Sequence, residues 1–195
     1  MSTATLPILE AAILVVAAPL CGVALATRRF RGALLAVVLF ALALLISAGW
    51  TMASWDWSTA AAAGVLASHA TLAVIGLALA ALGAWFGSTL RDPLDAAAFS
   101  GGAALVAALG LFAAGPLAAD LPTGIVNAAL SVSPIVSVAS AANVDLLRTD
   151  LLYRISPLAH LRFEYPAWNS PLLLYGVVLL VSVAGTARSL RKGWL

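Results

Sequence analysis

Charged side chains are scarce in this sequence, and their scarcity excludes most soluble folds. Asp, Glu, Lys and Arg make up 9% of the 195 residues, whereas 63% are hydrophobic. Soluble domains average about 25% charged and about 45–50% apolar residues. A globule of this length could not bury so much apolar surface, because small globules leave a large fraction of their atoms exposed. Lipid must therefore be the solvent for most of the exterior, and we expect an integral membrane protein.

Cysteine and histidine are equally rare, which argues against metal and haem sites. The single cysteine, Cys21, lies in an apolar run, so the chain cannot form an internal disulfide or a Cys-rich metal site. Of the two histidines, His69 lies in an apolar run and His160 in a polar segment, a poor arrangement for a pair of axial haem ligands. No P-loop, H-E-x-x-H or G-x-S-x-G sequence occurs. We expect no catalytic, cofactor-binding or metal-binding residue, and no enzyme activity.

Apolar runs dominate what is present. Five of them are close to the ~20 residues that an α-helix needs to cross a bilayer. They cover residues 6–27, 32–50, 62–88, 96–118 and 171–187. We therefore expect an all-α integral membrane protein with about five transmembrane helices, forming a single membrane domain over residues 1–195.

The more polar segment 120–170 is expected to be an outer re-entrant or interfacial helical segment rather than a further span. Its first part, 121–142, is interrupted by Pro, Gly, Asn and Ser residues. Backbone that departs from a helix at membrane depth must be buried in protein or line a wet cavity. Asn143 is then expected to cap an amphipathic helix that runs to Ile155 along the outer leaflet.

Basic residues at the edges of the apolar runs indicate the orientation of the chain. If the turn with Arg28, Arg29 and Arg31 is cytoplasmic, Arg91 and the basic C-terminal tail lie on the same side. Cytoplasmic loops carry an excess of Lys and Arg. We expect a multi-pass protein of the inner (plasma) membrane with its N-terminus outside and its C-terminus in the cytoplasm. Because the basic residues are dispersed, we expect no nucleic-acid partner.

Two ionisable residues inside the apolar runs are candidates for a polar path. Glu10 lies about one turn into the first run, where we expect a solvated interfacial carboxylate or, alternatively, a group that faces a substrate path or a partner helix. His69 is expected to hydrogen-bond between helices in the outer half of the bundle, or to line such a path.

Small and aromatic residues suggest packing and depth. Gly83 and Gly87 have the small-xxx-small spacing that lets helices approach closely, either within the chain or between subunits. Trp50 and Trp85 are expected at the level of the lipid headgroups, where indole rings are enriched.

The order of several features resembles a known family. The stretch Leu82–Pro93 ends a glycine-containing span in a short basic turn, and a run rich in small residues follows. Ser133-Pro134-Ile135 interrupts the segment before the last run, and a basic tail ends the chain. Over about residues 70–195, this order resembles the permeases, or membrane subunits, of ABC-2-type transporters. Those permeases usually have six spans and start with a cytoplasmic amphipathic helix; this chain matches them best without that helix and the first span.

The resemblance implies a function and partners. Arg28, Arg29, Arg31 and Arg91 would face a separate cytoplasmic ATPase subunit, and substrate would pass along the first, second and fifth spans of a homo- or hetero-oligomer. The leading hypothesis is thus a membrane-spanning subunit of an ATPase-coupled (ABC-type) transport complex, with no chemistry of its own. The alternative is a non-catalytic structural subunit of a larger membrane assembly, such as a respiratory or photosynthetic complex. A self-contained membrane enzyme is a third hypothesis, but convergent catalytic groups are missing.

Overall fold

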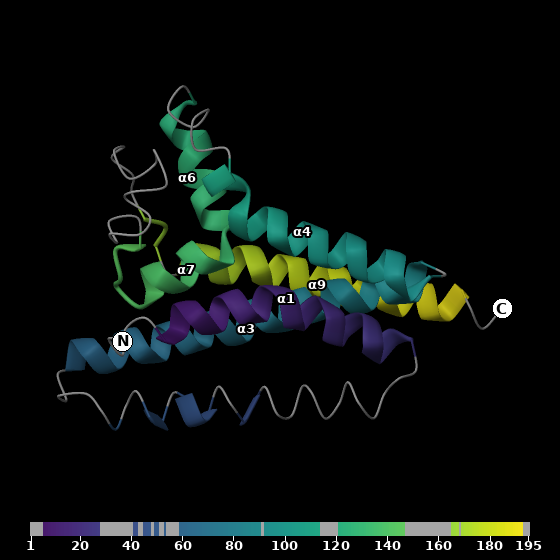
Figure 1. Cartoon of the computed structure of the whole chain (residues 1–195), viewed down its shortest axis with the longest axis horizontal. Coiled ribbons are helices and arrows are strands. Elements are labelled where there is room, and N and C mark those ends of the chain that lie inside the picture. The colour runs from purple at the N-terminus through teal and green to yellow at the C-terminus, as the bar shows by residue number, and fades with distance from the viewer. Residues whose placement is uncertain are drawn as a thin grey trace.

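The described part of the chain is a bundle of helices. The computed structural model describes residues 6–27, 41–42, 45–47, 49–50, 53, 59–90, 92–113, 121–146, 165–167 and 169–192. Within these ranges every regular element is a helix, and there is no strand (Figure 1). Four helices are long and apolar enough to cross a membrane: α1 (Leu6–Ala26), α3 (Thr59–Thr89), α4 (Pro93–Ala113) and α9 (Asn169–Lys192). The expected all-α membrane architecture is confirmed.

The long helices follow the apolar runs but end at different residues. α3 and α4 each begin three residues before the expected runs 62–88 and 96–118. α9 continues past the expected end of its run at residue 187 to Lys192. Its last turns contain Arg188 and Arg191, which are good helix formers and interact favourably with the C-terminal end of a helix dipole. Hydropathy marks the apolar part of this helix, whereas its helical structure extends into the charged part.

α3 is the central helix of the bundle. It packs against α1 and α9, and it also contacts α4 and the short helix α7 (Pro134–Ala141). Leu72 and Ile75 of α3 are fully buried and form one core cluster with Leu14 of α1, Ala104 of α4 and Val138 of α7. Between helices that lipid surrounds, side chains of this size stabilise a contact through close van der Waals packing.

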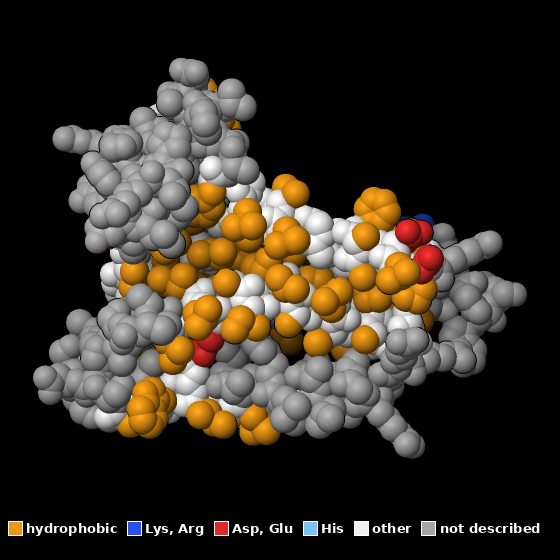
Figure 2. All heavy atoms as spheres, viewed as in Figure 1, with side chains coloured by type: hydrophobic (Ala, Val, Ile, Leu, Met, Phe, Trp, Pro, Cys, Tyr) orange, Lys and Arg blue, Asp and Glu red, His pale blue; other side chains and the backbone are white. Residues whose placement is uncertain are grey.

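Large apolar side chains also cover the outside of the bundle (Figure 2). Val106 of α4 and Leu180 of α9 are each 71% exposed, and Leu66 of α3 is 65% exposed. Apolar surface of this extent is a liability in water but is solvated by lipid tails. The exterior of the described helices therefore fits a bilayer, in agreement with the composition.

The direction of the long helices fixes how the chain passes through the bundle. α1, α3 and α9 run in one direction and α4 in the other, so that the start of α1 and the end of α9 lie at opposite ends (Figure 1). Because α1 and α3 are parallel, the chain has to return once along the bundle between them. Most of the expected span 32–50 lies outside the described residues, but residues 41–42, 45–47 and 49–50 are described and are helical.

Two short helices form a bent pair between α4 and α9. α6 (Thr123–Val132) and α7 meet at 87° around Ser133. α4 ends and α9 begins at the same end of the bundle, so the chain enters and leaves this segment on one side (Figure 1). This arrangement fits the expected excursion from that end; by length and composition alone, the pair qualifies either as a re-entrant loop or as one broken span. The described helix continues through Gly124 and Asn127 and breaks only before Pro134.

The prediction that Asn143 starts a helix is wrong, because Asn143 ends one. Its φ of 56° lies in the left-handed region, where asparagine is one of the few residues that is tolerated without large strain. The amide of Asn143 donates to the Ser140 carbonyl, and the amide of Val144 donates to the Ala139 carbonyl at 2.8 Å. These two bonds form a Schellman motif that closes α7. The rest of the expected amphipathic helix, residues 147–155, lies outside the described residues.

Candidate functional site

The contact between α1 and α3 is closest where glycines of one helix meet backbone of the other. A Cβ added to Gly83 would overlap the carbonyl oxygen of Pro19, and a Cβ added to Gly22 would overlap the carbonyl oxygen of Ala80. A Cβ at Gly87 would lie 3.1 Å from the Cα of Val23. Gly83 and Gly87 thus lie in a contact within the chain, and together with Gly22 they let the two backbones touch.

Glu10 and His69 meet nearer the start of the same helix pair. Oε2 of Glu10 lies 3.8 Å from Nε2 of His69, and the two side chains are 15% and 10% exposed. Ser47, which is also buried, places its Oγ 3.5 Å from the same imidazole nitrogen. The two residues of the expected polar path are therefore brought together, and His69 makes the expected contact between helices. Both lie in segments that are apolar enough to cross the membrane.

The expectation that Glu10 is a solvated interfacial carboxylate is wrong. Its Oε2 is buried and has no hydrogen-bond partner. The cause is the register of the two parallel helices. α3 starts at Thr59, ten residues before His69, whereas α1 starts at Leu6, four residues before Glu10. At 1.5 Å of rise per residue, α3 extends beyond the start of α1 by roughly 9 Å, so Glu10 lies beside α3 and not at its end.

The other ring nitrogen of His69 fixes its tautomer. Nδ1 lies 2.8 Å from the carbonyl oxygen of Val65, one turn earlier in α3. A carbonyl oxygen can only accept, so the Nδ1–H donates to it. In the neutral imidazole Nε2 then carries no proton, and its lone pair faces Ser47 and Glu10.

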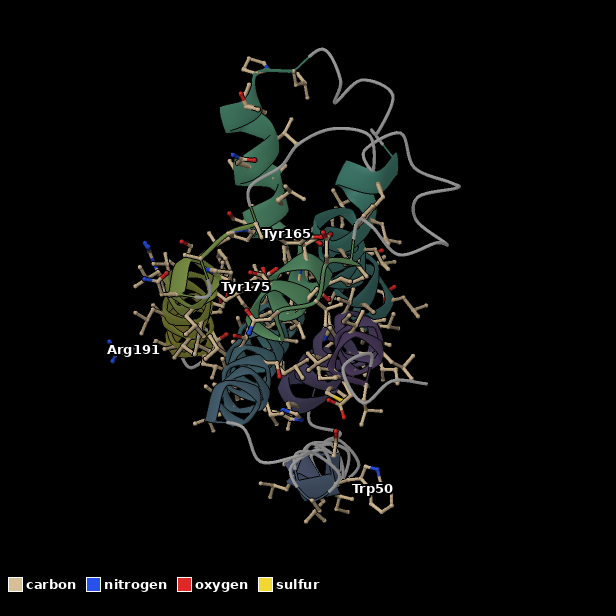
Figure 3. The ribbon with its side chains drawn as sticks, turned by 90° about the vertical axis from the view of Figure 1, so that its left-hand side faces the viewer. Trp50, Tyr165, Tyr175 and Arg191 are labelled. Carbon is tan, nitrogen blue, oxygen red and sulfur yellow. The ribbon has the colours of Figure 1, made fainter. Side chains whose placement is uncertain are left out.

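Hydrogen bonds stabilise the break between α6 and α7. The hydroxyl of Tyr175 on α9 donates to the carbonyl oxygen of Val132 at 2.6 Å. The hydroxyl of Ser137 donates to the carbonyl oxygen of Ser131 at 3.3 Å. Ser133 donates to the carbonyl oxygen of Ala108 in α4 at 3.2 Å and also caps the start of α7. Tyr175 extends from α9 toward this region (Figure 3). Carbonyls that a broken helix leaves free are thus paired within the protein, as membrane depth requires.

An apolar groove adjoins the bent pair. Its volume is about 730 Å³, and it lies between α3, α7 and the segment 165–167. Its α3 wall consists mostly of small residues, namely Ala63, Gly64, Ala67 and Ala70. At the rim, Ser140 donates to the carbonyl oxygen of Pro166 at 2.7 Å, and Tyr165 donates to Asp145 at 2.7 Å. The bent pair is thus connected to the segment that precedes α9.

At the opposite end of the bundle, α3 packs on α9 through an aromatic ring. The indole of Trp85 covers Gly185, where an added Cβ would overlap the ring. Next to it, the hydroxyls of Thr89 and Ser189 lie 3.1 Å apart. Trp85 therefore packs between two helices, and its expected position at the level of the headgroups stays a prediction. Trp50, by contrast, is 69% exposed and points away from the bundle (Figure 3).

Arg28, Arg29, Arg31 and Arg91, the residues expected to face an ATPase, lie outside the described residues. The described charged groups at that end are Asp92 and Asp95 at the start of α4 and Arg188 and Arg191 at the end of α9, all of them exposed. The carboxylate of Asp92 accepts a hydrogen bond from the amide of Leu94 at 2.8 Å and so caps α4.

Among the described residues, no three His, Cys, Asp or Glu side chains come close enough to hold a metal ion. Tyr175 was not among the candidates from the sequence. A polar aromatic residue inside an apolar run, downstream of a Ser-Pro break, was the one signal that could have identified it.

Comparison with known proteins adds no relative. The chain matches no protein-family model, no curated protein and no solved structure. Its function is therefore inferred from its own residues.

Proposed function

We propose that this chain is the membrane-spanning subunit of an ATPase-coupled, ABC-type transport complex, with no chemistry of its own. The observation that carries this proposal is the bent α6–α7 pair, which Tyr175 ties to α9 and Ser133 ties to α4. Broken helices in membrane proteins occur where the backbone is buried in protein or lines a pathway. The pair also lies directly before the last long helix, where ABC-2-type permeases have their broken hairpin.

The arrangement of helix ends supports one orientation. The end of α1, the turn between α3 and α4, and the end of α9 lie together at one end of the bundle (Figure 1). Arg28, Arg29, Arg31, Arg91 and the basic tail belong to this end in the sequence. By the positive-inside rule it is the cytoplasmic end. The N-terminus is then outside an inner (plasma) membrane. The cytoplasmic end of the bundle is the surface that receives the ATPase subunit.

The packing of the bundle favours a passive mechanical role. α1 and α3 touch through backbone at Gly22 and Gly83, so they move as one body. A partner that closes on ATP would push on the end of this body near Thr27 and Asp92. The far end of the same body bears the polar pair and contacts α7. Motion at the cytoplasmic end would thus reach the outer groove without any reaction in this chain.

Purification of the tagged full-length chain from its native membrane in a mild detergent tests the proposal. We expect a P-loop ATPase subunit to co-purify and the preparation to hydrolyse ATP. Charge-reversed Arg28→Glu/Arg91→Glu should lose the ATPase subunit, whereas Asp145→Asn, at the opposite end, should retain it. If pigment-binding or redox subunits co-purify and no ATPase is present, the chain is a structural subunit of a larger assembly and the proposal is wrong.

A further inference from the structure

The apolar groove between α3, α7 and the segment 165–167 lies where α3 becomes apolar enough to cross a membrane. That part of α3 starts at Ala63, and the α3 wall of the groove runs from Ala63 to Ala70. At 1.5 Å of rise per residue the wall is roughly 10 Å long. One leaflet contributes about 15 Å to a hydrocarbon core of about 30 Å. The groove therefore extends over much of the depth of one leaflet.

The described lining of the groove suits a hydrocarbon chain. Its α3 wall is smooth, because small residues recur on one face of the helix: Ala63, Gly64, Ala67 and Ala70. The hydroxyls of Ser140 and Tyr165, which also line it, already donate to Pro166 and Asp145. A water molecule in such a groove would need about two to four polar partners. Methylene groups need none and gain van der Waals contacts with the wall.

A polar group lies at the end of the groove where the apolar part of α3 starts. The side-chain amide of Asn143 makes no hydrogen bond with the described residues. A Cβ added to Gly64 would lie 3.4 Å from its Nδ2, so the amide covers this end of the α3 wall. Leu66, which also lines the groove, is 65% exposed. The groove is thus continuous with the surface that lipid covers, and it is polar at one end and apolar along its length, as a lipid is.

We propose that the groove binds one acyl chain of a bilayer lipid from the leaflet in which α3 starts. The chain lies along Ala67 and Ala70, and an ester or phosphate oxygen of the lipid accepts a hydrogen bond from the amide of Asn143. The volume of about 730 Å³ is within the range of about 300–1,000 Å³ that is usual for ligand sites. The bound chain fills the space between α3 and α7. The site belongs to this chain alone and does not depend on an ATPase partner.

Photolabelling of the full-length chain in phosphatidylcholine nanodiscs tests the site. The probe is a phosphatidylcholine with a diazirine in the middle of one acyl chain, and mass spectrometry of peptides locates the adducts after illumination. We expect the α3 wall to carry several-fold more adduct than Val106 of α4 and Leu173 of α9. These two positions are matched comparisons, because each is 71% exposed and neither lines the groove.

Filling the groove should remove the excess of adduct. Ala67→Phe places a ring on the α3 wall, and Ala70→Phe does so at an exposed position, where it disturbs folding least. Both variants should lose the excess on the rest of the wall and keep the labelling of Val106. The control Ala103→Phe, at an exposed position of α4, should label as the wild type does. Asn143→Gly keeps the left-handed backbone, which glycine adopts readily, but removes the amide and should lower the labelling of the wall several-fold.

Three results would overturn the proposal. Equal labelling of the α3 wall and of Val106 would show that only bulk lipid touches the groove. Unchanged labelling of the wall in Asn143→Gly would show that the amide does not hold the lipid. A disulfide between two copies of Ala70→Cys, in a Cys21→Ala background, would show that a second copy occupies the groove instead.

Discussion

The hydroxyl of Tyr175 lies 2.6 Å from the carbonyl oxygen of Val132, and this hydrogen bond joins the last long helix to the break between α6 and α7. Val132 is the last residue of α6, and its carbonyl is one of those that a helix end leaves without an internal partner. The bond spans 43 residues of sequence. It therefore connects the bent pair to α9, the helix that α3 also contacts.

Replacing Tyr175 with Phe should loosen the bent pair. The substitution keeps the buried ring but leaves the Val132 carbonyl unpaired, which we expect to cost about 1–2 kcal/mol. Thr186→Val is the matched control on the same helix, because the Thr186 hydroxyl bonds only to the Ser182 carbonyl of its own helix. Thermal unfolding of both variants measures the difference. Equal loss of stability in the two variants would count against a specific role of Tyr175.

A methyl group at Gly83 should separate α1 from α3. Gly83→Ala places a Cβ against the Pro19 backbone, which cannot move aside as a flexible side chain could. We expect a loss of about 1–3 kcal/mol from overpacking. Gly101→Ala is the control, because nothing lies within 4 Å of an added Cβ there. Alanine is the better helix former, so this control should be neutral or gain up to about 1 kcal/mol. Unchanged stability of Gly83→Ala would contradict the close contact.

The packing of Trp85 on Gly185 should appear as coupling between the two positions. Gly185→Ala forces the indole to move, whereas Gly176→Ala on the same helix meets no atom within 4 Å. We expect Gly185→Ala to lower the unfolding midpoint and Gly176→Ala to leave it in place. In the Trp85→Phe background, the smaller ring should reduce the loss of stability that Gly185→Ala causes. The double variant should then lose less stability than the two single variants lose together. Strict additivity would show that the two residues do not share a contact.

The spans could be predicted because each long helix coincides with an apolar run. Runs of ~20 apolar residues have few alternatives to a membrane helix, and α1 follows its predicted run 6–27 to within one residue. The bent pair was predictable as an irregular segment, because Ser133-Pro134 removes an amide donor in the middle of it. The breaking residue itself was not predictable. Gly124 and Asn127 weaken a helix, but α6 contains both of them.

The polar pair could not be predicted as a pair, because its geometry depends on helix register. Hydropathy places Glu10 near the start of a span, and that position alone suggests contact with water. The register of α1 against α3 comes from the contact of Gly22 and Gly83 with backbone, which no local pattern encodes. The same reason hides the Tyr175–Val132 bond, whose partners are distant in sequence.

We expect the bent α6–α7 pair to begin and end on the outer side of the membrane and α9 to end in the cytoplasm. Single cysteines at Gly124, Ala167 and Arg191, all of them exposed positions, can be introduced into a Cys21→Ala background. They are then treated with a membrane-impermeant maleimide on intact cells. We predict that the cysteines at 124 and 167 react from the outside and that the cysteine at 191 reacts only after permeabilisation. Reaction of positions 124 and 167 from opposite sides would make the bent pair a full span and contradict this account.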